Sequence, residues 1–351
     1  MRLKRTLPIV LGVVAIAAAL VFAVQLRKHA PPEAARLLPG ADGFLFADYS
    51  WVRRVNTGKP LYPVSHDPEY EQFIQETGFD YERDLDEVAF AIHYPKNWPG
   101  GGTGGSSPEP RFSEVIIARF DGTRCSAYLR RVAKSIENYD SVEIFTIPIS
   151  GRTFRVAILG VDTVAASNHD DPAVIRSMVD RSRRLASPFG GPALLRRYYK
   201  AVQLASPLWL VARVDPAAPG FAGWSTVFSK PADLVVSASF NPLHLPLRKG
   251  VLHLRAEAWA ANDDDARVIA DKLNIFLAMF HSAEASVGSP GSDADLKALF
   301  DSLQVRQEGD RALLVAALPT DVIRKLADSS GQINVEIPQQ QTQPTQKPKK
   351  H

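Results

Sequence analysis

The sequence predicts an α+β protein: an N-terminal transmembrane helix, then two tandem modules of antiparallel sheet with helices packed on one face. An uncharged, mostly apolar run extends from Leu7 to Val24. Strand-like segments follow one another through short turns, which favours antiparallel pairing. The order of segments in the first half recurs in the second, which indicates duplication. We therefore divide the chain into a signal anchor (1–30), a first module (31–204), a second module (205–330) and a polar tail (331–351).

The apolar run has the length of a membrane span. Its residues, Leu7 to Val24, would cover about 27 Å as a helix, close to the thickness of a bilayer core. More basic residues precede the run than follow it, so the N-terminus is expected in the cytoplasm and the bulk of the chain outside it, in the periplasm. The alternative is a signal peptide cleaved after Ala23, which would release a secreted form.

The first module is predicted to consist of strands interrupted by helices. The helices are expected from Asp67 to Thr77, from Asp121 to Ile136, after Asp171-Pro172, and from Pro192 to Val202. The expected strands are Gly43–Tyr49, Glu87–Tyr94, Ser113–Phe120, Val142–Ile147, Thr153–Leu159 and Asp162–Ser167.

The helix that begins after Asp121 has the clearest pattern. Asp121 is a good N-cap, and apolar residues recur at offsets of three and four from Cys125 to Ile136. Cys125 is the only cysteine, so no intramolecular disulfide can form. We predict that Cys125 is a buried structural residue on this face.

The second module repeats the order strand, strand, strand, helix, strand, strand, helix, although the first module has one extra strand. Its long helix starts at Asp263, and a short one is expected from Pro319 to Ala327. The expected strands are Pro207–Val214, Ala232–Phe240, Gly250–Ala260, Leu303–Gln307 and Ala312–Leu318.

The charge distribution argues against nucleic acid as a partner. The whole chain has a net charge of +3, but basic residues concentrate in the first thirty residues and in the tail, which leaves −4 for residues 31–330. A nucleic-acid binder needs a concentrated cationic surface. The tail after Pro338 is polar and proline-bearing, and it is expected to be disordered.

No segment has a recognisable catalytic signature. The serine-hydrolase elbow and the zinc motif His-Glu-x-x-His are absent, and the glycine-rich segment Pro99–Pro108 lacks the lysine of a phosphate-binding loop. His169-Asp170-Asp171 and the pair His281 and Glu284 resemble metal ligands, but a helix start and a helix end explain them. Asp263 to Asp265 suit a helix N-terminus. We therefore predict no catalytic, cofactor-binding or metal-binding residues and no cofactor.

Three segments carry a family resemblance: Leu37–Asp42, Gly78–Asp86 and Ile116–Asp121. Together they resemble the membrane-anchored bacterial proteins grouped as the domain of unknown function 3352, over about residues 35–330. The resemblance implies a bacterial envelope protein without an assigned activity, and it supplies no catalytic residues.

These observations favour a membrane-tethered, extracytoplasmic and non-enzymatic interaction module. Its expected partners are the membrane, through Leu7 to Val24, and an envelope protein. One alternative is an envelope hydrolase with a dispersed active site. Another is a carrier of apolar ligands, suggested by aromatic residues such as Trp209 and Trp224.

Overall fold

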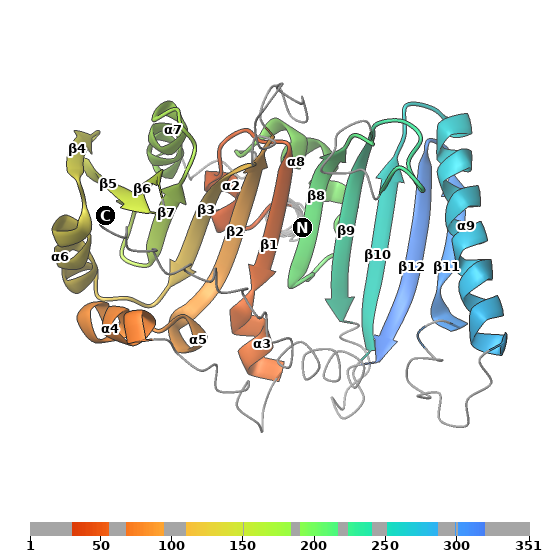
Figure 1. The fold of residues 1–351 in the computed structure, drawn as a ribbon, viewed down its shortest axis with the longest axis horizontal. Helices are drawn as coiled ribbons and strands as arrows, with labels where there is room; N and C mark the ends of the chain where they lie inside the picture. The colour runs from red at the N-terminus through yellow and green to blue at the C-terminus, as the bar shows by residue number, and fades with distance from the viewer. Residues whose placement is uncertain are drawn as a thin grey trace, which may run out of the picture.

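One large antiparallel sheet dominates the computed structural model, which describes residues 30–55, 68–94, 110–149, 151–183, 190–216, 224–240, 251–286, 299 and 301–319. Twelve strands lie side by side in the order β11-β12-β10-β9-β8-β1-β2-β3-β7-β6-β5-β4 (Figure 1). The strands are β1 (Gly43–Asp48), β2 (Leu85–His93), β3 (Arg111–Ala118), β4 (Ser135–Tyr139), β5 (Val142–Ile149), β6 (Arg152–Ile158), β7 (Thr163–Ser167), β8 (Leu208–Val214), β9 (Ala232–Phe240), β10 (Val251–Trp259), β11 (Gln304–Glu308) and β12 (Arg311–Pro319).

The helices are short, apart from one. They are α2 (Glu33–Leu37), α3 (Tyr49–Val55), α4 (Pro68–Thr77), α5 (Tyr81–Asp84), α6 (Gly122–Val132), α7 (Ala173–Ser182), α8 (Ala193–Tyr198), the 3-10 helix η1 (Tyr199–Ala201) and the 24-residue α9 (Asp263–Ser286).

The predicted fold, in which each of two tandem modules has its own sheet, is wrong. Strand β1 pairs with β8, so that Phe46 lies opposite Trp209, and this pairing joins the two halves into a single sheet. Their rings are stacked with centroids 5.4 Å apart. Residues on β8 therefore bury apolar surface against the first half, which makes continuous pairing more favourable than two sheets with exposed edges.

Helices cover both faces of the sheet, which also corrects the predicted placement on one face. Successive residues of a strand point to opposite faces. Trp209 and Val211 on β8 join the main core with α2, α7 and α8. Leu210 and Val214 on the same strand instead join a second core with α9. Helix α9 therefore packs on the face opposite α2, α7 and α8.

The hairpin β4–β5 corrects the predicted length of the helix after Asp121. That helix ends at Val132, and Ile136 lies in β4 instead. Asp140 and Ser141 both adopt positive φ angles, 47° and 61°, between the paired residues Tyr139 and Val142. Two positive φ angles are typical of the tight turn that matches strand twist. The turn lets residues 135–139 pair with β5, so they form a strand and not the last turn of the helix.

The predicted membrane span, Leu7 to Val24, lies outside the described residues, as do the predicted helix from Pro319 to Ala327, beyond its first residue, and the polar tail 331–351. Within the described part of the chain, no helix is both long and apolar enough to cross a membrane.

Candidate functional site

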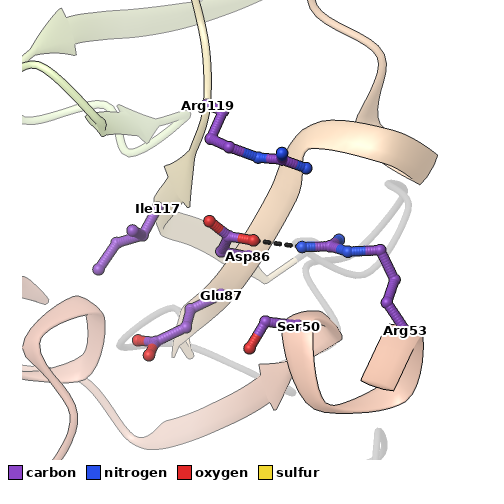
Figure 2. Close-up of a pocket in the computed structure, with 6 residues that line it drawn as sticks. All are labelled: Ser50, Arg53, Asp86, Glu87, Ile117 and Arg119. Carbon is purple, nitrogen blue, oxygen red and sulfur yellow. Dashed lines mark hydrogen bonds and ion pairs between the residues drawn. The ribbon is translucent and has the colours of Figure 1, made fainter. Parts of the chain in front are cut away.

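A cleft of about 680 Å³ opens where β1 ends and α3 begins (Figure 2). Helix α3 contributes Ser50 and Arg53, and β3 contributes Ile117. The remaining lining residues are Asp86 and Glu87 on β2, and Arg119 just after β3. Of the six, five are polar or charged, so the cleft is suited to a polar ligand.

A β-bulge brings two consecutive carboxylates to this cleft. The register between β2 and β3 shifts between Leu85 and Glu87, which leaves Asp86 as the extra residue. In a regular strand Asp86 and Glu87 would point to opposite faces, whereas both line the cleft here. Bulges commonly redirect a side chain beside a functional site.

Asp86 is neutralised by Arg53. The Arg53 guanidinium forms an ion pair with Asp86 and also donates a hydrogen bond to the carbonyl of Leu85. Both contacts fix α3 to the bulge. The start of α3 is fixed by Asp48, whose Oδ1 accepts hydrogen bonds from the Ser50 hydroxyl at 2.6 Å and from the Trp51 amide at 2.9 Å.

Glu87 is not part of the ion pair between Asp86 and Arg53. Its carboxyl points away from the Asp86–Arg53 pair (Figure 2). Its Oε2 atom is buried and finds no hydrogen-bond donor among the described residues. Burial raises the pKa of Glu87 to about 7, and the nearby charges of Asp48, Glu33 and Asp86 raise it further in that order.

Arg119 provides an exposed cation at the same cleft. Its side chain is 64% exposed, and one guanidinium nitrogen donates to the Arg83 carbonyl at 2.6 Å. The same nitrogen lies 3.9 Å from Asp84, a carboxylate that Arg83 also contacts at 2.6 Å. The Arg119 guanidinium is therefore largely exposed at the cleft, and its nearest carboxylate, Asp84, is paired more closely with Arg83.

The polar side chains of the cleft are largely engaged with one another or with neighbouring groups. Catalysis needs a nucleophile or base with a second group that orients it. Glu87 can hold a proton near neutral pH, but the Ser50 hydroxyl donates to Asp48, and Asp86 is paired with Arg53. An ionisable carboxyl beside a cleft can bind a ligand without turning it over.

A second polar cluster lies inside the main core. The His93 ring and the Ser113 hydroxyl are 2.9 Å apart, and the same hydroxyl lies 2.9 Å from that of Ser167. Ser113 is only 1% exposed, so it cannot meet a substrate as a nucleophile. Burial and the adjacent His169 ring lower the pKa of His93 to about 4. This cluster satisfies polar groups within the core.

The side chains of His169, Asp170 and Asp171 all make local contacts. The Asp171 carboxylate accepts from the Ala173 amide at 2.8 Å at the start of α7, and Asp170 pairs with Arg111 at 3.1 Å. His169 Nδ1 accepts from the Asp171 amide at 3.1 Å. In the described part of the chain, no three His, Cys, Asp or Glu side chains are grouped to hold a metal.

The other residues weighed as candidates are dispersed. Cys125 is half-buried rather than fully buried, and burial raises the pKa of its thiol. Asp265 pairs with Lys230 at 2.8 Å at the start of α9. His281 and Glu284 lie in α9, but their side chains are outside the described residues.

The two tryptophans that suggested an apolar-ligand carrier differ from each other. Trp209 is 1% exposed and packs within the main core. Trp224 is 46% exposed and lies beside Phe228, with ring centroids 6.0 Å apart. Core packing therefore accounts for Trp209 without a ligand.

Sequence reasoning missed the cleft. The adjacent acidic residues Asp86 and Glu87 were the available signal, because two carboxylates at a strand start are unusual. Their convergence depends on the bulge, and the bulge depends on pairing with β3.

Comparisons with known proteins give only distant likenesses. No protein-family model matches the chain, and no curated protein matches it. The structure of crystal form III of TP0453 has 10% sequence identity and a TM-score of 0.46, covering 85% of this chain and 99% of that one. Crystal form I of TP0453 has 10% identity and a TM-score of 0.44, covering 86% and 98%. At these TM-scores the likeness supports no statement about function.

Proposed function

We propose that this chain is a membrane-tethered, extracytoplasmic interaction module that binds an envelope protein through α9. The observation that carries the proposal is a stripe of exposed apolar side chains on this helix. Val268, Ile275, Phe276 and Met279 are 43%, 62%, 54% and 65% exposed. Their spacing of seven, eight and eleven residues places them on one side of a helix.

The opposite side of α9 is already packed. Ala266, Ile269 and Ala270 are at most 4% exposed and belong to the second core. Val268, Ile275 and Met279 are therefore additional to the apolar surface that the second core buries. A soluble surface rarely gathers large apolar side chains in one place unless they serve a contact.

The charges on α9 favour a protein over an anionic lipid surface. Within the described side chains the helix has four aspartates, at 263, 264, 265 and 271, and two cations, Arg267 and Lys272. Helices that lie on anionic membranes are rich in Lys and Arg on the polar face. The matching partner would offer an apolar groove with a basic rim.

Site-specific crosslinking in cells tests the contact. A photoreactive residue at Ile275 or Met279 should give the same discrete protein adduct, whereas the matched exposed position Asn274 should not. The double variant Ile275→Asp with Met279→Asp should remove the adduct obtained from a photoreactive residue at Phe276. Equal adducts at positions 274 and 275, or adducts that survive the aspartates, would contradict the proposal.

The tether rests on the apolar run Leu7 to Val24 and is tested separately. The full chain should sediment with membranes, and external protease should digest its folded part in cells with a permeabilised outer layer. A mature N-terminus at Val24 would contradict the tether and indicate cleavage instead.

A further inference from the structure

We propose that the basic side of α8 and η1, defined by Arg196, Arg197 and Lys200, lies against the anionic phospholipid headgroups of the membrane that holds the chain's apolar run. This contact rests on the tether proposed above and deepens it by giving the folded part an orientation. Three observations support it: a group of cations without carboxylates, the place where the folded part begins, and the position of α9 on the other face of the sheet.

The cations belong to a stretch of unusual composition. Residues 181–214 contain seven Arg and Lys residues and no Asp or Glu, whereas residues 31–330 as a whole have a net charge of −4. The positive charge is therefore concentrated in one stretch of an otherwise acidic chain. A concentrated patch of one sign attracts surfaces of the opposite sign.

The cations on α8 and η1 share one exposed side. Arg196, Arg197 and Lys200 are exposed, while Leu194 and Leu195 belong to the main core. Within the described part of the chain, no carboxylate forms an ion pair with any of the three cations. A helix C-terminus favours cations in its last turn, but this preference does not account for the missing carboxylates.

Arg181 on α7 extends the basic side. It is half-buried, and it forms no ion pair with a carboxylate of the described residues. Burial, and then the charge of Arg196, lower the pKa of Arg181. The two guanidinium groups are therefore within electrostatic reach of each other, so the end of α7 and the exposed side of α8 present cations to the same region.

The folded part begins beside these cations. Ala30 is the first described residue, and α2 starts at Glu33. A Cβ added at Gly191, two residues before α8, would lie 3.5 Å from the Arg36 Cα of α2, and α2, α7 and α8 share the main core (Figure 1). The apolar run ends at Val24, and the six residues from there to Ala30 span at most about 20 Å. The tether therefore holds the α2 and α8 side of the sheet close to the membrane.

The rest of the surface agrees with this orientation. Leu204 follows Lys200 by four residues and is 56% exposed. Basic residues accompanied by an exposed apolar side chain are typical of surfaces that lie at the headgroup region. The acidic helix α9 packs on the opposite face of the sheet, so contact through α8 leaves it directed away from the anionic lipid and open to an envelope protein.

The test uses the full chain reconstituted in vesicles of phosphatidylcholine, alone or mixed with anionic phosphatidylglycerol. A spin label at Ala193→Cys, on the exposed side of α8, is measured in a Cys125→Ser background against nickel-chelating lipid headgroups. Phosphatidylglycerol should increase the relaxation enhancement about threefold, and the increase should disappear at about 1 M salt, where the screening length is about 3 Å. The same label at Asn274→Cys on α9 should not respond.

Arg130 and Arg131 on α6 provide the matched control. Like Arg196 and Arg197, they are consecutive arginines in the last turn of a helix, but each is paired with a glutamate. Arg196→Gln with Arg197→Gln should remove most of the increase caused by phosphatidylglycerol. Arg196→Lys with Arg197→Lys, which keeps the charge, should retain it, as should Arg130→Gln with Arg131→Gln.

The outcomes separate this contact from the tether. Equal enhancement in the two kinds of vesicle, or equal effects of the two glutamine variants, would overturn the headgroup contact if the chain still floats with the vesicles. Failure of the chain to float with either kind of vesicle would contradict the tether and, with it, the orientation.

Discussion

At the scale of single residues, burial changes the ionisation of three side chains in two opposite directions. Glu87 and Glu114 have pKa values raised to about 7, and His93 has one lowered to about 4. In each residue the neutral form is favoured, because the charged form would lose hydration; at His93 the nearby Asp42 offsets only part of this loss. A rise in pH therefore reduces the stability contributed by the two carboxyls and increases the stability contributed by the imidazole.

His93 should make the fold sensitive to acid. Its pKa in the folded state lies below the ordinary value of 6.5, so its contribution is complete above pH 6.5 and is lost as the pH falls towards about 4. The loss amounts to about 3 kcal/mol. His93→Gln, which can still hydrogen-bond Ser113, should flatten this decline in urea unfolding. Parallel declines in the two proteins would show that His93 is not responsible.

Glu114 should act in the opposite direction. Its folded pKa is raised, so the contribution of Glu114 to the free energy of unfolding is greatest below about pH 4.5 and is lost as the pH rises through about 7. Glu114→Gln should therefore stabilise the protein by about 3 kcal/mol at about pH 8 and change little at about pH 4. Glu69→Gln, an exposed site on α4, is the control and should stay within about 0.5 kcal/mol at both. A gain that is equal at both pH values would contradict the assignment.

At the scale of elements, β10 contains a buried carboxylate that ties it to β12. Glu257 is 1% exposed, and its two oxygens pair with Arg255 at 2.7 Å and Arg311 at 2.9 Å. The Arg311 guanidinium also lies 5.1 Å from the centre of the Trp259 ring. Since both oxygens are used, the cost of burying this charge is largely offset within the sheet.

Removal of that carboxylate should be costly. Glu257→Ala removes the partner of Arg255 and one of the two carboxylates on Arg311, and it should lower the free energy of unfolding by about 3 kcal/mol, measured by urea denaturation. Glu308→Ala is the matched control, because Glu308 pairs with the same Arg311 at 2.6 Å but is 43% exposed, and it should cost less than about 1 kcal/mol. Similar costs for both variants would rule out the burial argument.

At the scale of the whole molecule, the β1–β8 pairing makes the two halves depend on each other. Trp209 on β8 is 1% exposed, stacks on Phe46 of β1, and meets the Tyr199 ring edge-on at 5.4 Å. Its partners thus come from the first half of the chain, although the residue itself belongs to the second. A shared core of this kind favours one cooperative unfolding transition.

Trp209→Ala should therefore destabilise the entire sheet. We expect a loss of about 3–5 kcal/mol and a single calorimetric transition that moves as a whole. Trp224→Ala, at a site 46% exposed, should cost less than about 1 kcal/mol. Two separate transitions, with only one of them displaced, would mean that the halves fold independently.

Sequence alone determined the local features of this protein. Strand β9 has the predicted bounds, Ala232–Phe240, because its composition favours a strand. Asp121 is confirmed as the N-cap of α6, with hydrogen bonds from the Thr123 and Arg124 amides at 2.9 and 3.1 Å. A cap and a strand depend on neighbours within a few residues, so the local sequence is enough to predict them.

Tertiary structure alone decided how those elements join and where a ligand can bind. The single sheet depends on pairing between β1 and β8, which are about 165 residues apart in the chain. The cleft depends on a bulge, which forms because the register between β2 and β3 shifts at Asp86. Both outcomes are set by contacts between distant segments, whose energies are shared across the sheet and leave no periodic pattern in the sequence.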